Sequence, residues 1–585
     1  MNIEKYTYRM LRLMHQATCF QDIFHMKNER EVNEMKKKTL SRFLAAALVG
    51  IMLVGCGAQG EQNVDTESNS TENSVSESIT PEVVGELTYP VDTDVELRLY
   101  SMGIPLSSAY MDATESPFHT GLSENTGIKI KWEYEAAGAD ANTAYNLMLQ
   151  EDELPHIIFT AGNATVANGT QLLADGLIYD LTEYLPTYAP DYWEYINRPE
   201  NEETLRSLKT DAGQLFCFPF LRESTYNITY LGPAIRQDWL DECGLDAPVT
   251  LEDWENVLVT FKEKYNARLG FVLGRFNIGG GFASGTDAHA ALKLDWYVDD
   301  NGKVQCANAQ PEWKALLEVL NRWYEMDLID PDFTTADDAS IRTKVLNNEI
   351  GACFTAMSQV TNYIADAEAE NTGAKWVGIG YARTAEGEPT SCINTARSLW
   401  NAGYGAMITT SCNEEELIAA LQFLNYGYSE EGMMYWNYGT EGVSYTLDAD
   451  GNPQFTELVT ADELGINEAF RKYTGVATSG IAVQLESFVK AKNNPVSAEA
   501  VYKWIENTDA DKYVLPGLAY SEEDTMTYND ITNAMNTFVA EEALKFVTGD
   551  RSLDEFDKFV DQLESLGMND VLEIIQGAYD RYLEK

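Results

Sequence analysis

Side chains able to act as nucleophiles, acids and bases are numerous, but their spacing does not form a catalytic pattern. The chain has only five histidines and no G-x-S-x-G nucleophile elbow, so a Ser-His-Asp triad has no support. Its 93 acidic residues allow many carboxylate pairs, whereas glycoside hydrolysis requires two carboxyls at a defined separation across one sugar bond. The sequence specifies no such pair, and we expect a protein that is not an enzyme.

Residues 274–285, GRFNIGGGFASG, form the only glycine-rich segment that could approach a phosphate group. The segment lacks the lysine of a P-loop and the glycine spacing of a dinucleotide fingerprint. We therefore expect a mobile surface loop or a cleft-edge loop here, and no nucleotide cofactor.

Metal and redox chemistry lack the spacing they need. No C-x-x-C pair occurs, and only three histidines follow residue 56, so we expect no metal centre and no cofactor. In DADGN, Asp448, Asp450 and Asn452 alternate, but the next residues offer no distal bidentate carboxylate, and a hairpin turn at Asp450-Gly451 is favoured. Six cysteines are expected to be mostly small buried apolar residues: Cys217, Cys243, Cys306, Cys353, Cys392 and Cys412.

Aromatic side chains are the most informative candidates for ligand contact. Trp and Tyr faces suit the flat C–H faces of sugar rings, and small-ligand clefts commonly combine an apolar body with a polar rim. Most of the 11 Trp, 32 Tyr and 22 Phe must nevertheless be core. The candidates lie beside Gly or Asn at segment ends, at strand ends, or before an expected crossover strand: Trp400, Trp436, Tyr438, Tyr100, Thr160 and Tyr226.

Cys56 is the residue whose context most clearly indicates a covalent modification. A basic segment at 36–42 is followed by an apolar core at 43–54 and by Leu53-Val54-Gly55-Cys56. This order resembles the signals of bacterial lipoproteins, which implies that Cys56 becomes the first mature residue and carries the acyl chains. The apolar core is about a dozen residues, short of the ~20 that a spanning helix needs. Met35 begins a signal of normal length, so we interpret residues 1–34 as a mis-assigned leader.

Composition after the signal indicates an acidic exported protein on a tether. The full chain has a net charge of −52, which disfavours binding to nucleic acid and to anionic lipid. Residues 57–87 contain no Lys, Arg or aromatic residue, and we expect 56–90 to be the lipidated cysteine with a disordered tether. About 500 further residues exceed one ordinary core, so two lobes are expected.

Apolar patterns predict an α/β architecture in both halves. Short apolar strands are expected near 95–99, 128–132 and 157–159, with a helix at 142–150, which is typical of a parallel sheet covered by helices. The second half is expected to contain a strand at 228–231, a helix from Arg236 ending at Gly244, a helix capped by Thr250 and Asp253, and a C-terminal helical pair at 552–567 and 571–583.

Four blocks of sequence resemble, in order, the family 1 extracellular solute-binding proteins, which are ligand receptors of ABC importers. The nearest subgroup is the large lipoprotein receptors of Gram-positive bacteria associated with carbohydrate uptake. The occurrence of the four blocks in this order along the chain is specific to the family. The blocks are Ile228–Lys262, Tyr324–Phe333, Tyr435–Phe455 and Phe546–Tyr582.

The resemblance implies a two-lobe periplasmic-binding-protein-like α/β fold (type II), with hinge strands and an interlobe ligand cleft. Carried onto this sequence, lobe 1 takes 91–224 and about 396–434, and lobe 2 takes 225–395 and about 435–585. The crossings near Arg222–Asn227 and Thr395–Asn401 are the expected hinges.

The implied function is that of a membrane-anchored extracellular substrate-binding component that delivers an oligosaccharide to ABC permease subunits. A monomer without nucleic-acid partners is expected. A receptor for a peptide or another polar solute remains open, as does a surface glycoside hydrolase. Relatives often carry an acidic, calcium-binding loop after the tryptophan-containing helix, but residues 262–271, KEKYNARLGF, lack alternating oxygen ligands, so we expect no calcium there.

Overall fold

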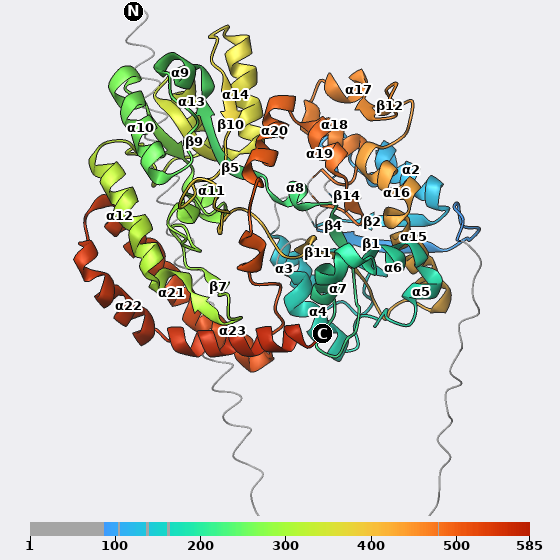
Figure 1. Ribbon diagram of the computed structural model, residues 1–585. Coiled ribbons are helices and arrows are strands. Elements are labelled where there is room, and N and C mark those ends of the chain that lie inside the picture. The colour runs from blue at the N-terminus through green and yellow to red at the C-terminus, as the bar shows by residue number, and fades with distance from the viewer. Residues whose placement is uncertain (1–86, 103, 105, 136–139, 161–163, 478) are drawn as a thin grey trace, which may run out of the picture. The chain divides into compact units, whose positions relative to one another are not determined.

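The computed structural model describes residues 87–585 apart from 103, 105, 136–139, 161–163 and 478 (Figure 1). The expected leader, signal peptide, Cys56 and most of the expected tether therefore lie outside the described residues. Within the part that is described, no helix is both long and apolar enough to cross a membrane.

The first lobe is built on a six-stranded sheet in the order β14-β4-β11-β3-β1-β2. All neighbouring strands are parallel except β11, which runs antiparallel to β3 and β4. The predicted strands near 95–99, 128–132 and 157–159 are confirmed as β1, β2 and β3. The strands are β1 Glu96–Ser101, β2 Lys129–Glu133, β3 Ile157–Thr160, β4 Phe218–Arg222, β11 Trp400–Ile408 and β14 Val483–Gln484.

Helices pack against this sheet, and the central strand β3 is buried along its whole length. The predicted helix at 142–150 is confirmed as α3. The helices of this lobe are α2 Pro117–Thr126, α3 Ala141–Met148, α4 Ala164–Ala174, α5 Leu185–Tyr188, α6 Pro190–Ile196, α7 Glu202–Leu208, α15 Glu414–Asn425, α16 Glu430–Tyr438, α17 Glu457–Thr460, α18 Ile466–Tyr473 and α19 Glu486–Lys492.

Residues after 434 differ from the expected division of the chain. Trp436, Phe470 and Phe488 belong to the core of the first lobe, although we expected 435–585 in the second. The reason is that β14 pairs with β4 and extends the first sheet, which holds the preceding helices on that side. We therefore propose that the chain returns to the second lobe near residue 494 instead of 435.

The second lobe contains a four-stranded sheet in the order β10-β5-β9-β6, with β5 antiparallel to both neighbours and β6 parallel to β9. A small hairpin of β7 Trp296–Val298 and β8 Val304–Cys306 lies apart from it. The main strands are β5 Leu231–Arg236, β6 Arg268–Phe271, β9 Ile350–Ala356 and β10 Trp376–Gly378.

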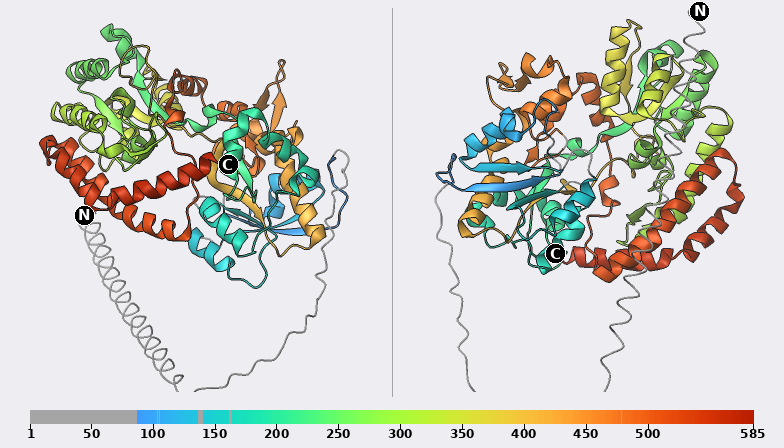
Figure 2. Two further views of the ribbon diagram at one scale, coloured as in Figure 1. Left: turned by 60° about the horizontal axis from the view of Figure 1, so that its bottom comes forward. Right: turned by 180° about the vertical axis from the view of Figure 1, so that it is seen from behind.

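Ten helices of six residues or more cover this part of the described chain, and α21, α22 and α23 gather along one flank (Figure 2). They complete one core cluster that joins residues 226–393 with 500–582. The helices are α9 Gln237–Cys243, α10 Leu251–Tyr265, α11 Leu273–Ile278, α12 Pro311–Glu325, α13 Asp338–Leu346, α14 Met357–Ala369, α20 Pro495–Trp504, α21 Glu522–Thr548, α22 Phe556–Ser565 and α23 Met568–Leu583.

The strand predicted at 228–231 is wrong by about three residues. A short helix, α8 Thr225–Ile228, occupies that position, and β5 begins at Leu231 and includes Gly232 and Pro233. Pro233 donates no backbone hydrogen bond, but its carbonyl accepts from Ile379 N at 3.1 Å, so the strand tolerates it within the sheet.

Local capping signals were partly reliable. The Thr250–Asp253 capping box is present at the start of α10, and the hairpin turn at Asp450-Gly451 joins β12 Tyr445–Leu447 to β13 Pro453–Phe455. The helix expected from residue 552 begins only at Phe556, as α22, because Ser552 instead caps a 3-10 turn by accepting from Asp554 N.

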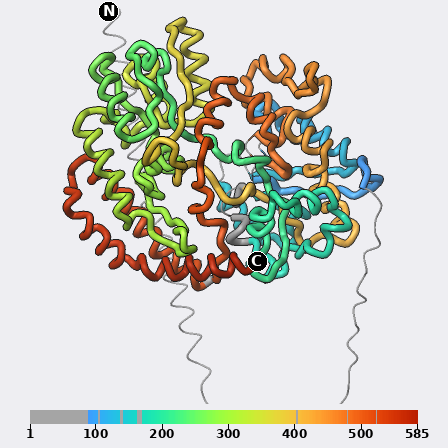
Figure 3. The backbone as a smooth tube through the Cα atoms, viewed as in Figure 1, coloured from blue at the N-terminus to red at the C-terminus, as the bar shows by residue number. Residues whose placement is uncertain are grey.

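Three segments connect the two lobes, and each can be followed in Figure 3. The first joins β4 to β5, the second runs from about residue 394 into β11, and the third joins β14 and α19 to α20. The first two coincide with the expected crossings, whereas the third was expected near residue 435 and instead follows α19.

Candidate functional site

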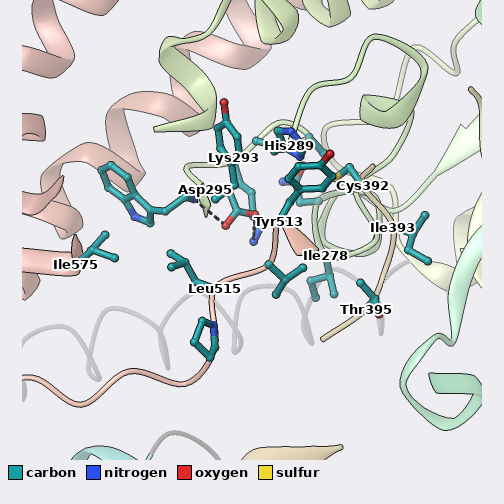
Figure 4. A pocket seen from close by; sticks show the side chains of 18 of the residues that line it. Ile278, His289, Lys293, Asp295, Cys392, Ile393, Thr395, Tyr513, Leu515 and Ile575 are labelled. Carbon is teal, nitrogen blue, oxygen red and sulfur yellow. Dashed lines mark hydrogen bonds and ion pairs between the residues drawn. The ribbon is translucent and has the colours of Figure 1, made fainter. Parts of the chain in front are cut away.

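A cavity of about 370 Å³ opens in the second lobe beside the segment that crosses into β11 (Figure 4). Four stretches supply most of its wall, with Tyr528 of α21 and Ile575 of α23 added: the end of α11 and the turn after it at 277–280, residues 289–297 leading into and including part of β7, residues 391–395 of the crossing, and residues 513–520 before α21. The cavity is therefore built from loops held by separate helices and strands, as is common for ligand sites.

Aromatic rings form one side of this cavity. The His289 and Tyr297 rings stack with centroids 4.0 Å apart and an interplanar angle of 24°, and Tyr513 lies 4.6 Å from the His289 ring. Val298 N donates to Tyr513 O at 2.9 Å, so the small hairpin holds the 513–520 segment in place. Tyr520 and Tyr528 form a second stacked pair at 5.1 Å.

Polar groups stand among these rings. Lys293 Nζ lies 2.9 Å from Asp295 Oδ2, and both side chains are about two-fifths exposed at 41% and 37%. Asp295 Oδ1 also accepts from Trp296 N at 3.1 Å, which fixes the carboxylate at the entry to β7. Ser391 Oγ is buried in the wall without a hydrogen-bond partner among the described residues, so a ligand hydroxyl could satisfy it.

Burial keeps the aromatic groups neutral. It lowers the pKa of His289, against the opposing effect of Asp287, so the imidazole is uncharged at neutral pH. Burial also raises the pKa of Tyr297 and of Tyr513 to about 12, with nearby carboxylates adding to the effect. The phenols consequently remain protonated and can both donate and accept hydrogen bonds.

This arrangement suits non-covalent capture of a polar ligand that has flat apolar faces. Neutral rings provide stacking surfaces, while Lys293, Asp295 and Ser391 provide charged and hydroxyl partners. In the described residues, no group of three or more His, Cys, Asp or Glu could hold a metal ion. Asp448 instead accepts from the backbone N–H groups of Asp450 and Asn452 within the hairpin turn.

The glycine-rich segment at 274–285 lies at the cavity rather than on a mobile surface. Asn277 and Gly280 line the wall, whereas Phe276, Phe282 and Ser284 are buried. The expectation of a mobile surface loop was wrong, because the phenylalanines between the glycines pack into the core of the second lobe. The alternative of a cleft-edge loop agrees with the position of Asn277 and Gly280.

Three of the residues singled out from the sequence lie on the first sheet. Tyr100 is in β1, Thr160 ends β3 and Trp400 begins β11, and all three are buried, with exposed fractions of 6%, 0% and 5%. Trp400 Nε1 donates to Tyr404 O at 3.0 Å. Tyr100 and Thr160 lie near the carboxyl edge shared by the parallel strands β1 and β3.

The other three residues pack inside the cores. Trp436 and Tyr438, in α16, are 2% and 0% exposed, and Trp436 packs edge-on against Phe118 with centroids 5.1 Å apart. Tyr226, in α8, donates from its hydroxyl to Ala498 O at 2.9 Å. None of the six sequence candidates, all of them described residues, lines the 370 Å³ cavity.

The residues of this cavity were not selected from the sequence, although one local sequence pattern pointed to some of them. Tyr513 and Tyr520 flank Pro516 and Gly517, and an aromatic residue near a turn-forming pair is the same pattern that drew attention to Trp400. Nothing in the local sequence marks His289, because its role depends on Tyr297 stacking against it across a loop.

Comparison with known proteins places these observations in a family. The model of the bacterial extracellular solute-binding protein family matches residues 107–434. The chain is 24% identical over 434 residues to lipoprotein LipO of Bacillus subtilis (strain 168), covering 71% of this chain and 75% of that protein. It is 22% identical over 590 residues to the fructooligosaccharide ABC transporter substrate-binding protein FusA of Streptococcus pneumoniae, covering 94% and 99%.

Solved structures agree on the fold. The FusA complex with kestose matches with a TM-score of 0.61 at 19% identity, covering 84% of this chain and 100% of that one. An HMO binding, ABC-transporter associated solute binding protein from Bifidobacterium longum infantis matches with a TM-score of 0.64 at 18% identity, covering 83% and 99%. The two-lobe fold expected from the sequence is thereby confirmed, and this chain belongs to the family of bacterial extracellular solute-binding proteins.

Proposed function

We propose that this protein is the extracellular substrate-binding component of an ABC importer and that it captures an oligosaccharide. The observation that carries the proposal is the cavity of stacked neutral rings with charged and hydroxyl partners in the second lobe. Such a site offers flat faces for sugar rings and polar groups for their hydroxyls. The names of FusA and of the Bifidobacterium protein, which refer to oligosaccharides and ABC transporters, support the same substrate class.

The ligand contacts we propose differ in part from those suggested by the sequence. His289, Tyr297 and Tyr513 are the main stacking residues. Trp400 and Thr160 remain proposed contacts of the first lobe because they lie at the ends of central strands, and Tyr100 is retained with them. Trp436, Tyr438 and Tyr226 are better explained as core residues, because they are buried side chains of helices α16 and α8 and do not lie at the end of a central strand.

Anchoring at the outer face of the cell membrane is proposed through acyl chains on Cys56. The lipobox order in the sequence supports it, and lipoprotein LipO is a relative of the same family. Two or more acyl chains are needed, since a single acyl chain gives only marginal binding to a membrane. We further propose that the protein works as a monomer, without enzymatic activity and without nucleic-acid partners, and delivers its ligand to permease subunits.

A binding screen on the chain purified from residue 57 onward tests the function. Neutral and acidic oligosaccharides, peptides and other polar solutes are compared by the shift in melting temperature, and the sugars are recovered afterwards and weighed by mass spectrometry. An oligosaccharide should raise the melting temperature and be recovered unchanged. Stabilisation by peptides alone would contradict the sugar assignment, and shortened sugars would indicate a glycoside hydrolase.

A further inference from the structure

Two enclosed cations at the edge of the first sheet lack a carboxylate partner. Arg222 ends β4 and Lys492 ends α19, and neither forms an ion pair with a described Asp or Glu. The gaps at 103, 105, 136–139, 161–163 and 478 contain no Asp or Glu. Unpaired cations are unexpected in a chain with a net charge of −52, because carboxylates are abundant.

Both cations are held in place by neutral groups. Arg222 donates from Nη1 to Gln484 Oε1, and its guanidinium lies 4.8 Å from the Phe220 ring centroid. Lys492 Nζ donates to Ala477 O at 3.2 Å and lies 5.7 Å from the Phe470 ring centroid. These contacts satisfy some N–H groups but compensate no charge.

The fold brings the two cations to one place. Arg222 and Gln484 are register partners in the parallel pair β4–β14. Gln484 Nε2 donates to Val476 O at 2.7 Å, and Lys492 donates to the next carbonyl along the chain, that of Ala477. Lys492 is therefore linked directly to the backbone of residue 477, and Arg222 is linked to that of residue 476 through the Gln484 side chain.

The electrostatic consequences agree with this geometry. Burial lowers the pKa of Arg222 to about 10, and no carboxylate contributes a compensating effect. Burial lowers the pKa of Lys492 as well, and the charge of Arg222 adds to that effect. An arrangement that holds two like charges without compensation is destabilising unless a ligand supplies the opposite charge, and such groups are typical of functional sites.

A cavity of about 250 Å³ gives a ligand access to Lys492. Its wall includes Ile104, which follows the end of β1, together with Asn467, Thr474 and Arg471. β1, β3 and β4 all run in the same direction, so their carboxyl ends share one edge, where ligands of open α/β sheets bind.

The other charges near this cavity are already paired. Arg471 lies 2.7 Å from Glu468, which also accepts from Ser107 Oγ and Ser108 N. Lys472 pairs with Asp462 at 2.6 Å. The surplus positive charge at this edge therefore comes from Arg222 and Lys492.

We propose that the oligosaccharide captured by this protein carries an acidic group, and that Lys492 binds that group at the carboxyl edge of the first sheet, where the nearby charge of Arg222 adds to the attraction. This inference rests on the proposed function, since it specifies the substrate class of the same receptor. A carboxylate or a sulfate ester has the required negative charge and acceptor oxygens.

The test compares a trisaccharide of galacturonate, a sulfated galactotriose and neutral galactotriose by titration calorimetry with the full mature chain. The wild type should bind one of the acidic sugars about tenfold or more tightly than the neutral one, with a preference that weakens at high salt. Lys492→Met should remove most of that preference, and Lys492→Arg should retain it. Lys490→Met is the matched control, because Lys490 is ion-paired with Glu486 at 2.6 Å.

The unliganded melting temperature separates binding from folding. Lys492→Met should leave it unchanged or raise it, because an uncompensated charge is removed from an enclosed position. Arg222→Met should also reduce the preference for acidic sugars, which tests the contribution of the second cation independently. Tight binding of neutral sugars with no preference for acidic ones would overturn this inference while leaving the proposed function intact. Failure of every sugar, with peptides bound instead, would overturn both.

Discussion

His119 is the most deeply buried histidine among the described residues, at 2% exposed. Its Nδ1 lies 2.8 Å from Ser116 Oγ and its Nε2 lies 3.0 Å from the Tyr134 hydroxyl, while the ring meets Trp132 edge-on. Both neighbours are neutral, and burial lowers the pKa of His119 from 6.5 to about 4. The folded protein therefore holds a neutral imidazole where the unfolded chain would accept a proton.

This pKa difference predicts acid sensitivity. The stabilisation is fully present above pH 6.5 and declines as the pH falls toward 4, reaching a loss of ~3 kcal/mol in the free energy of unfolding. His119→Gln should destabilise the protein at pH 7 but flatten this part of the pH dependence. Urea unfolding of both proteins between pH 4.5 and 7.5 measures the difference. If the unfolding free energies of the two proteins change with pH in parallel, protonation of His119 does not cause the acid sensitivity.

Trp436 illustrates what a single residue's sequence context can and cannot reveal. Its Asn and Gly neighbours in sequence favoured a cleft position. In the fold, however, its ring packs against Phe118 and against Gly475, where an added Cβ would lie 2.2 Å from the Trp436 ring. Those partners are distant in sequence, so no local pattern contains them. We predict that Trp436→Ala costs ~3–5 kcal/mol of stability. A melting temperature close to that of the wild type, together with weakened ligand binding, would restore the cleft assignment.

At the scale of elements, the sequence predicted the strands that have an apolar or alternating pattern and missed those whose limits depend on packing. β1, β2 and β3 follow from short apolar or alternating runs. β5 did not, because Gly232 and Pro233 normally interrupt strands. Here Gly232 packs against the Trp504 ring, and Pro233 O accepts from Trp504 Nε1. The third crossing was expected too early, near residue 435, for a similar reason: β14 is only two residues long, and only its pairing with β4 defines it.

The packing of β5 can be tested at Gly232. A Cβ at this position would lie 2.5 Å from the Trp504 ring, so Gly232→Ala should destabilise the protein by ~1–3 kcal/mol. Gly274→Ala is the control, because Gly274 lies in α11 with no atom within 4 Å of the added Cβ, and it should be neutral or stabilising. Equal unfolding free energies for the two variants would argue against the position of Trp504 over β5.

At the scale of the whole molecule, α23 links the two lobes near its end. Ile575 belongs to the second core, whereas Arg581 Nε and Lys585 Nζ each lie 3.0 Å from an oxygen of Asp211 in the first lobe. Tyr582 adds a hydrogen bond of 2.8 Å to Glu203 Oε2. Contacts of this kind bias a two-lobe receptor toward the conformation in which they form.

We predict that Asp211→Asn weakens ligand binding by about two- to fivefold, because exposed ion pairs contribute only ~0–1 kcal/mol. The effect should shrink in high salt, which screens the wild-type pairs. Affinities of both proteins at low and high salt provide the measurement. An unchanged affinity at low salt would mean that these ion pairs do not bias the conformation that binds.

The claim that matters most is that the rings at the second-lobe cavity hold the ligand. Calorimetric titration of the best oligosaccharide from the binding screen into the wild type, Tyr297→Ala and Tyr513→Ala tests it most directly. Each variant should lose ~1–3 kcal/mol of binding free energy at an unchanged melting temperature. Tyr502→Ala, which removes a partly exposed ring outside the cavity, should retain wild-type affinity. Full affinity in both cavity variants would contradict the account.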